Sequence, residues 1–354
     1  MQFGLHYLMS CPSSHSPEQI YRETLEQAQH ADALGFESVW PVEHHFVRAA
    51  SVMPCPMLLL AAIAARTRKL RLGTAIVQMP LNHPVRVAEE AATLDVLSGG
   101  RVELGVGRGG NAIHYRGLGV DQAQSRARFE ESMGVLQRCL SEERFSFRGA
   151  FYDLEDVSLS PRPLQRPHPL LRVAANSPET AKWAGRAGLP IMFATNINPL
   201  PRLPQLMDVY ETGRAEAGHA PATANDVSVL MPVLVGRERA EVRALMEPSI
   251  RYFAQLAMAV AEAGLAHCRS AEERAPLELL IERVRTLGYE QVAAVMGALG
   301  TPDDCIAKLQ SVQRELKVAR IITWFNFGGL VPHTAAMRSM ELFASEVMPQ
   351  LTRG

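Results

Sequence analysis

A carboxylate followed by two adjacent histidines, Glu43, His44 and His45, is the first group of residues in the chain that suggests chemistry. Histidine changes its charge near neutral pH and also binds transition metals, so the triplet suits proton transfer or metal binding. In an extended segment neighbouring side chains point to opposite sides, and two such histidines would not easily bind one ion. We therefore expect no metal site. When the triplet is taken alone, a purely structural interpretation is as good as proton transfer: one histidine would be buried and hydrogen-bonded, and the other would lie at the surface.

A glycine-rich segment, residues 105–110 (Gly-Val-Gly-Arg-Gly-Gly), formally satisfies the G-x-G-x-x-G pattern of dinucleotide-binding proteins. That fingerprint belongs to a first strand followed at once by a helix, whereas this segment follows the fourth predicted strand. It is also succeeded by Gly117 and Gly119 before any predicted helix, so we reject the fingerprint. The glycines still allow a flat ligand to approach the backbone closely. Arg108 offers a forked donor to a phosphate, unless it pairs with a local carboxylate.

The segment Asn176-Ser177-Pro178-Glu179-Thr180 has the pattern of a helix N-terminus with Ser177 as its capping residue. Free amides and the positive end of the helix dipole favour an anion there, and the Ser177 and Thr180 hydroxyls add donors. Capping alone explains Ser177 equally well. Together with Arg108, this helix end suits a phosphate group.

Strands and helices alternate along almost the whole chain, which is typical of repeated strand–helix units and a parallel sheet. Eight such units predict an α/β fold, a closed (β/α)8 TIM barrel, forming a single domain over residues 1–354. The predicted strands are Gln2–Leu8, Ser38–Val42, Leu70–Val77, Val102–Val106, Leu171–Ala174, Ile191–Ala194, Val227–Val235 and Ile321–Phe325. The predicted helices are Pro17–Leu34, Pro56–Thr67, Pro84–Leu97, Ser125–Leu140, Pro178–Ala187, Leu203–Ala217 and Ala240–Ala263, with another starting at Thr301.

Two segments do not fit a minimal barrel. Residues Phe145 to Pro169 form a proline-rich excursion with a strand-like piece at Phe151–Leu159. Residues Ala263 to Gly300 are a long insertion between the seventh and eighth strands, and we predict that this insertion is a lid. Because the carboxyl ends of the strands meet at one end of such a barrel, the candidate residues above are expected to converge there.

Composition excludes several classes of protein. The chain has 36 Lys and Arg against 37 Asp and Glu, so it lacks the basic excess of a nucleic-acid binder. Its longest apolar run, Pro54 to Ala65, is shorter than the about 20 residues of a membrane span. The first residues lack the basic start and apolar stretch of an export signal, so we expect a cytoplasmic protein.

Several segments in the same order are similar to the bacterial luciferase-like flavin-dependent monooxygenases, and the chain resembles this family over essentially its whole length. The segments are Gly35-Phe36-Glu37-Ser38-Val39-Trp40 leading into Glu43-His44-His45-Phe46, Gly73-Thr74-Ala75-Ile76-Val77, His83-Pro84-Val85-Arg86, Ser98-Gly99-Gly100-Arg101, Gly107-Arg108-Gly109, Ser177 to Gly188, Val295 to Ile306 and Met340 to Pro349.

The resemblance implies an enzyme that binds reduced FMN, reacts it with dioxygen to a flavin hydroperoxide, and inserts one oxygen into a small organic or carrier-bound substrate. It implies two components, with a separate flavin reductase as transient partner, because the sequence offers no convincing nicotinamide site. It also implies a homodimer. Nothing indicates nucleic acid, a membrane or a metal as a partner.

The resemblance also assigns residues. Arg108, Ser177 and Thr180 would hold the flavin phosphate, and Glu43, Ala75 and Asn176 would line the flavin. A non-prolyl cis peptide, frequent in the family after the third strand, would here join Ala75 and Ile76. His44 would be the general acid or base, supported by His45.

This chain departs from the light-emitting members of the family around the ring of the flavin. Where those have a reactive cysteine, a tyrosine, an aspartate and a tryptophan, it has Gly107, Asn111, His114 and Thr195. We therefore expect FMN use without bioluminescence. Two alternatives stay open: a deazaflavin-dependent hydride-transfer enzyme of the same superfamily, and a non-catalytic partner subunit, against which the retained His44 and Arg108 argue.

Overall fold

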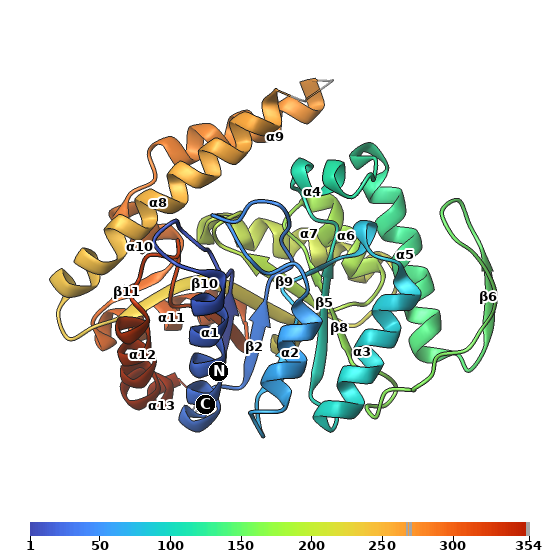
Figure 1. Cartoon of the computed structure of the whole chain (residues 1–354), viewed down its shortest axis with the longest axis horizontal. Coiled ribbons are helices and arrows are strands. Elements are labelled where there is room, and N and C mark those ends of the chain that lie inside the picture. The colour runs from blue at the N-terminus through green and yellow to red at the C-terminus, as the bar shows by residue number, and fades with distance from the viewer. Residues whose placement is uncertain (267, 269–270, 352–354) are drawn as a thin grey trace.

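Eight parallel strands close into a barrel in the computed structural model, which describes residues 1–266, 268 and 271–351 (Figure 1). In order around the barrel they are β1 (Gln2–Tyr7), β2 (Ser38–Pro41), β3 (Arg71–Gly73), β5 (Val102–Gly107), β8 (Leu170–Ala174), β9 (Ile191–Ala194), β10 (Val227–Val235) and β12 (Arg320–Trp324). β12 pairs with β1 and closes the cylinder. The predicted TIM barrel is confirmed.

Helices connect the strands and surround the barrel. They are α1 (Pro17–Leu34), α2 (Pro56–Ala64), α3 (Pro84–Ser98), α5 (Ser125–Ser141), α6 (Pro178–Arg186), α7 (Leu203–Glu216), α8 (Arg239–Leu265), α11 (Pro302–Leu316), α12 (His333–Leu342) and α13 (Met348–Leu351). The predicted starts agree because the local signals are strong. Ser16 caps α1 by accepting from the Gln19 N–H at 3.1 Å, and Thr301 and Asp304 form a capping box at α11. None of the described helices is long and apolar enough to span a membrane.

The third predicted strand, Leu70–Val77, is wrong in one respect, because the structure divides it into β3 and β4 (Val77–Gln78). The chain bends between them, where the peptide from Ala75 to Ile76 is cis as predicted. The Thr74 hydroxyl donates to the Gly105 carbonyl at 2.7 Å, and a Cβ on Gly105 would lie 1.9 Å from the Thr74 carbonyl oxygen. Gly105 is therefore needed for close packing of the two strands.

The interior of the barrel is filled by Trp40, which is fully buried. A Cβ on Gly73 would lie 2.2 Å from the Trp40 ring, and one on Gly4 would lie 2.8 Å from its indole nitrogen. Small residues on β1 and β3 thus make room for one large side chain from β2. The Trp40 indole N–H donates to the Ser38 hydroxyl at 2.8 Å, so its polar atom is also satisfied.

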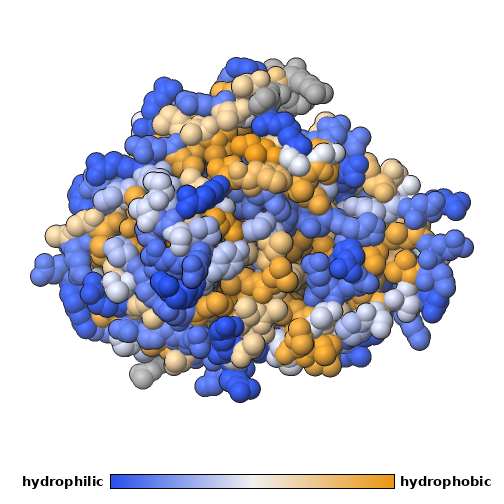
Figure 2. All heavy atoms as spheres, viewed as in Figure 1, coloured by the Kyte–Doolittle hydropathy of each residue, from blue (hydrophilic) through white to orange (hydrophobic). Residues whose placement is uncertain are grey.

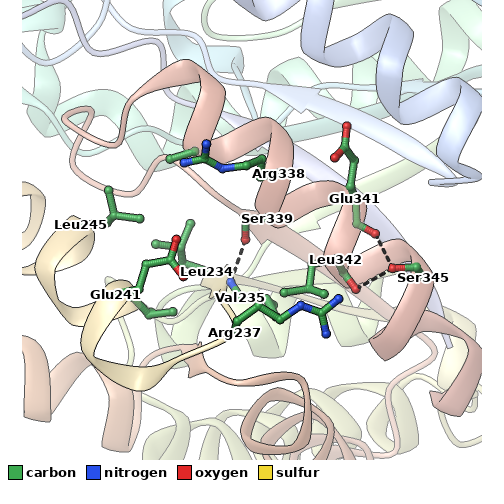
Figure 3. A pocket seen from close by; sticks show the side chains of 13 residues that line it. Leu234, Val235, Arg237, Glu241, Leu245, Arg338, Ser339, Glu341, Leu342 and Ser345 are labelled. Atoms are coloured by element: carbon green, nitrogen blue, oxygen red, sulfur yellow. Dashed lines mark hydrogen bonds between the residues drawn. The ribbon is translucent and has the colours of Figure 1, made fainter.

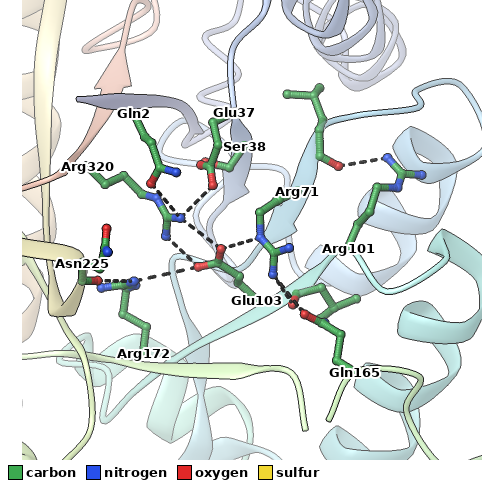
Figure 4. A network of polar contacts seen from close by, with 12 residues as sticks. Gln2, Glu37, Ser38, Arg71, Arg101, Glu103, Gln165, Arg172, Asn225 and Arg320 are labelled. Carbon is green, nitrogen blue, oxygen red and sulfur yellow. Dashed lines mark hydrogen bonds and ion pairs between the residues drawn. The ribbon is translucent and has the colours of Figure 1, made fainter. Parts of the chain in front are cut away.

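The amino-terminal end of the barrel is closed by buried charges (Figure 4). Glu103 accepts from Arg71 at 2.6 Å and from Arg320 at 2.7 Å, and Arg320 also pairs with Glu37 at 2.7 Å. Arg172 approaches Glu103 to 4.0 Å. Burial alone would raise the pKa of Glu103, but the three arginines together lower it below its ordinary value.

Both segments that did not fit a minimal barrel add helices or strands to its eight strand–helix units. The excursion is an antiparallel hairpin of β6 (Phe145–Arg148) and β7 (Asp153–Val157); the sequence indicated only the second strand. The insertion between the seventh and eighth barrel strands contains the end of α8, α9 (Ala271–Arg285), α10 (Tyr289–Val295) and β11 (Ala298–Gly300), which pairs with β10. Residues 267 and 269–270 of this predicted lid lie outside the described residues. Figure 1 shows α8 and α9 running side by side above the barrel.

Candidate active site

Glu43 is a buried carboxylate that joins the loops after β2 and β4. One of its oxygens accepts from the Gln78 backbone N–H at 2.8 Å. The other accepts from the Asn82 amide and from Nε2 of His45, both at 2.9 Å. Both oxygens of Glu43 are thus hydrogen-bonded to protein groups. Glu43 therefore holds the loops of the site together and does not present a free charge.

His44 and His45 both contact His114. The Nδ1 atom of His44 lies 3.3 Å from Nε2 of His114, and the His45 backbone N–H donates to the same Nε2 atom at 3.2 Å. On its other side, Nδ1 of His114 lies 3.1 Å from Oε1 of Gln78, whose Nε2 donates to the Glu43 carbonyl at 2.9 Å. A continuous hydrogen-bonded chain therefore runs from Glu43 through Gln78 and His114 to His44.

Burial keeps His44 and His114, the two histidines of this hydrogen-bonded chain, neutral. Burial, and secondly the nearby His45, lower the pKa of His44 to about 4. Burial, followed by His44 and His45, lowers the pKa of His114 to about 3. At neutral pH both rings are therefore uncharged and able to accept a proton only through a free ring nitrogen.

The expectation that His44 and His45 point to opposite sides is wrong. Both rings lie edge-on against His114, with ring centroids 4.4 and 5.2 Å away. The assumption failed because β2 ends at Pro41, and the residues that follow do not keep the alternation of a strand. No group of three or more His, Cys, Asp or Glu side chains that could hold a metal ion occurs among the described residues.

The glycine-rich segment packs against β4 and the residue before it. A Cβ on Gly107 would lie 2.3 Å from the Ile76 side chain, and one on Gly109 would lie 2.2 Å from Oε1 of Gln78. The expectation of no helix before Gly117 is wrong, because α4 (Ala112–Gly117) follows directly, with Asn111 accepting from the Ile113 N–H at 3.1 Å. The segment follows the fourth barrel strand, and its glycines serve these close contacts, so nothing in the geometry requires a dinucleotide.

The guanidinium of Arg108 has no bonded partner among the described residues. It forms no hydrogen bond or ion pair with any residue that the structure describes, although the side chain is partly buried. The Tyr115 hydroxyl donates to the Arg108 carbonyl and so ties this loop to α4. The pKa of Glu179 is lowered by its own backbone N–H and by Ser177, and further by Arg126 and Arg108. Arg108 therefore acts electrostatically on the first turn of α6.

The N-terminus of α6 has the predicted cap. Ser177 Oγ accepts from the Thr180 N–H at 3.3 Å, and the Ser177 hydroxyl donates to Oγ1 of Thr180 at 3.1 Å. Asn176 lies just before it and accepts from the Ala194 N–H at 3.0 Å, which joins the ends of β8 and β9. The next residue after β9, Thr195, has a fully buried hydroxyl that forms no hydrogen bond within the part of the chain that the structure describes.

The sequence-predicted residues thus gather at the carboxyl ends of neighbouring strands. Glu43, His44 and His45 follow β2, Ala75 and Ile76 lie between β3 and β4, Arg108 follows β5, and Asn176, Ser177 and Thr180 follow β8. Sequence reasoning did not assign Gln78, Asn82 and His114 to the site. Gln78 could have been found as a polar residue directly after an apolar strand. His114 was noticed only as a departure from the resembled family, and Asn82 gave no signal.

A separate hollow of about 330 Å³ lies between the end of β10 and helices α8 and α12 (Figure 3). Its lining mixes apolar side chains with Arg237, Glu241 and Arg338. Arg237 pairs with Glu346 at 2.6 Å, and the Ser339 hydroxyl accepts from the Val235 N–H at 2.7 Å. None of the predicted site residues lines this hollow, so it is not the site described above.

Comparison with known families agrees with the geometry. A family model described as "Luciferase-like monooxygenase" matches residues 1–318. The chain belongs to the luciferase-like monooxygenase family. Among its relatives is the 4-hydroxyprotoasukamycin monooxygenase of Streptomyces nodosus subsp. asukaensis, 30% identical over 99% of this chain and 92% of the relative. Another is the oxygenase component of a flavin-dependent trigonelline monooxygenase of Acinetobacter baylyi, 32% identical over 53% of this chain and 52% of the relative.

Several solved structures have the same fold. The monooxygenase RslO1 of Streptomyces bottropensis gives a TM-score of 0.81 at 29% identity, covering 99% of this chain and 100% of that one. Two more distant structures share the fold at 99% coverage of this chain and 98% of the other. They are the oxygenating constituent of 3,6-diketocamphane monooxygenase of Pseudomonas putida in complex with FMN, with a TM-score of 0.77 at 20% identity, and an F420-dependent secondary alcohol dehydrogenase, with a TM-score of 0.73 at 19% identity. The family resemblance expected from the sequence is confirmed.

Proposed function

We propose that this protein is the oxygenase of a two-component flavin-dependent monooxygenase, which uses reduced FMN and dioxygen to add one oxygen atom to a small organic or carrier-bound substrate. The observation that carries the proposal is the unpaired Arg108 guanidinium beside the first turn of α6, linked through α4 to the buried histidines. A phosphate site next to a proton-transfer group at one end of a barrel suits a phosphorylated flavin. The oxygenase component among the relatives supports a separate flavin reductase as partner.

The residues present fit FMN. Arg108, the hydroxyls of Ser177 and Thr180, and the free amides of α6 would hold the phosphate. The cis peptide from Ala75 to Ile76, with Asn176 beside the end of β9, would line the ring. The buried Thr195 hydroxyl, which has no hydrogen-bond partner among the described residues, would be available to a polar atom of the ring. Glu43 would act by fixing the loops beneath the ring.

Reduced FMN, when bound, supplies the electrons and the reaction with dioxygen. The protein has to orient the ring, move a proton and keep water away. We assign the proton transfer to His44, with His45 in support. We assign the exclusion of water to the insertion 263–300 as a lid. Phe253 lies in α8, the helix that leads into the insertion, and packs against Phe327 at a ring distance of 4.5 Å, which ties this helix to the segment after β12.

Oxygen consumption with chemically reduced FMN tests the proposal directly. With a panel of candidate substrates, we expect substrate-dependent oxygen uptake and a product heavier by one oxygen atom in mass spectrometry. A protein that binds reduced deazaflavin and transfers hydride without oxygen would instead be the hydride-transfer enzyme of the same superfamily. A protein that binds neither cofactor would be a non-catalytic partner subunit.

Replacing Arg108 by alanine should weaken FMN binding by about 10- to 150-fold, because a charge-assisted contact contributes about 1.5–3 kcal/mol. Riboflavin lacks the phosphate, so its affinity should change little. Fluorescence titration of the wild type and the variant with both flavins measures the difference. Arg116→Ala on α4 is the matched control, because that arginine is exposed. Equal weakening of FMN and riboflavin would refute the phosphate assignment.

We also propose a homodimer that pairs through α2 and α3. Leu58 is 73% exposed and Leu97 is 68% exposed, and Figure 2 shows apolar side chains over this part of the surface. Light scattering should give twice the chain mass of 38.9 kDa, and Leu97→Glu should shift the protein to the monomer. A wild-type mass equal to one chain would rule the pairing out.

A further inference from the structure

The hydrogen-bonded chain through Gln78 and His114 has two ends whose direction is fixed. At one end the Glu43 backbone carbonyl can only accept a hydrogen bond, and at the other the His45 backbone N–H can only donate one. Because the carbonyl accepts from the Gln78 side chain at 2.9 Å, the amide nitrogen of Gln78 faces Glu43. Its Oε1 atom therefore faces His114, and Nδ1 of His114 must donate to it across 3.1 Å.

The other nitrogen of His114 must be an acceptor. Its Nε2 receives the His45 backbone N–H at 3.2 Å, and a protonated Nε2 would place two donors against each other. His114 is therefore neutral, with its proton on Nδ1. This agrees with its 2% exposure and with the lowering of its pKa to about 3 by burial and the neighbouring histidines.

The same reasoning shows which ring nitrogen of His44 carries the proton. Its Nδ1 atom faces the acceptor Nε2 of His114 at 3.3 Å, so Nδ1 of His44 carries a proton and donates it. In the neutral ring the remaining nitrogen, Nε2, then has a free lone pair. Gly109 packs closely against the same Gln78 side chain, since a Cβ at Gly109 would lie 2.2 Å from Oε1 of Gln78.

We propose that His114 is a positioning residue that holds His44 as the neutral Nδ1–H tautomer, so that Nε2 of His44 is a proton acceptor, and His44 acts first as a base rather than as an acid. In the step that this prepares, a proton leaves an oxygen or nitrogen of the bound reactants, its electron pair stays there, and the proton bonds to Nε2 of His44. The catalytic use of this base depends on the function proposed above; the tautomer does not.

The charged and titratable groups around His44 are few among the described residues. His114 on α4 faces its Nδ1 atom, His45 adjoins it in the same loop, and Glu43 reaches it only through Nε2 of His45 at 2.9 Å. No carboxylate among the described residues contacts the His44 ring. A hydrogen bond with the His45 backbone favours its protonated form, but burial and the nearby His45 side chain outweigh that bond and lower its pKa. An aspartate in place of His114 would accept from the same Nδ1 proton but would add the missing negative charge.

Nitrogen-15 NMR of the histidine rings in the flavin-free protein tests the proposal. His44, identified by the loss of its signals in His44→Ala, should show a protonated Nδ1 and a bare Nε2. His6 serves as an internal reference, because its Nδ1 lies 2.9 Å from the Trp40 carbonyl and must also be protonated. A bare Nδ1 on His44 would overturn the assignment.

Three substitutions separate positioning from mere packing. His114→Gln retains an acceptor near the former Nε2, and His44 should keep its tautomer. His114→Asp should keep the tautomer and raise the pKa of His44 by about one to two units. His114→Leu removes the acceptor, so His44 should no longer be held as the Nδ1–H tautomer. It should also lower kcat about 10- to 100-fold, as when the partner that orients a metal-bound histidine is removed. If Leu does not fold, the Asp and Gln variants suffice.

A His44 tautomer and pKa that are the same in all the His114 variants would refute the proposal. Because these NMR measurements need neither flavin nor oxygen, they remain informative if the protein fails to consume oxygen with reduced FMN. Such a failure would overturn the proposed function and leave the tautomer assignment intact. Conversely, normal oxygenation with an Nε2–H tautomer of His44 would overturn only this inference.

Discussion

Replacement of His44 by alanine is expected to lower the rate of product formation by about 10²- to 10⁴-fold, the usual contribution of a positioned acid or base. The ring of His44 is partly buried, its pKa is lowered to about 4 by burial and His45, and it lies at the end of a hydrogen-bonded chain. It contributes to proton transfer and not to holding the phosphate, which belongs to Arg108 and α6. Flavin affinity should therefore be unchanged.

The distinguishing measurement is coupling, the product formed per reduced flavin oxidised. In His44→Ala the flavin should still be oxidised by dioxygen, but the oxygen should leave as peroxide instead of entering the substrate. His83→Ala is the matched control. Like His44 it follows a strand, here β4, but His83 is exposed and packs against Tyr152 at a ring distance of 5.3 Å. Wild-type coupling in His44→Ala would remove this residue from the mechanism.

The pH dependence of wild-type activity follows from the pKa of His44. A base with a pKa of about 4 is already unprotonated at pH 5, so the activity that depends on His44 should be flat from about pH 5 to 8. It should fall only as the pH approaches 4, where Nε2 becomes protonated. An ordinary histidine would instead lose activity near pH 6.5.

Much of the barrel was predictable because its signals are local. Ser16, Ser177 and Thr301 precede a proline and cap a helix, and each of these helices starts where predicted. The division of the third strand was not predictable in the same way. It depends on Thr74 packing against Gly105, a residue 31 positions away in the sequence, and no local propensity records that contact.

The site was predictable only in part, for the same physical reason. Arg108 and the cap at Ser177 could be placed from strand ends and helix signals. The contact between His114 and His44 joins residues 70 positions apart, and its geometry depends on a short helix, α4, that lies among glycines. The sequence singled out His114 only as a departure from related proteins, which gave a position but no partner.

Neutralising Glu103 is expected to destabilise the fold by about 3–5 kcal/mol, the usual cost of breaking a buried ion pair. In Glu103→Gln, Arg71, Arg320 and Arg172 would lose the anion that they share, and only Glu37 would face Arg320. The Nε atoms of Arg172 and Arg320 already lack hydrogen-bond partners, so the network has no spare acceptor. Urea denaturation at pH 7 measures the loss, with Glu142→Gln as control, because the Glu142 pair with Arg138 lies at the surface.

The pH dependence of the difference in unfolding free energy between wild type and Glu103→Gln shows whether lost charge causes the destabilisation. The arginines overcome burial and hold the folded-state pKa of Glu103 below its ordinary value of 4.5, so the folded protein binds fewer protons there than the unfolded chain. The stability that this provides is fully present above pH 4.5 and is lost as the pH falls through the folded-state pKa. The gap in unfolding free energy between wild type and Glu103→Gln should therefore be constant from pH 7 to about pH 5 and shrink below 4.5. Because His6, His44 and His114 titrate in both proteins, their contributions cancel in the difference. A gap that stays constant into the acid range would mean that lost packing, and not lost charge, destabilises the variant.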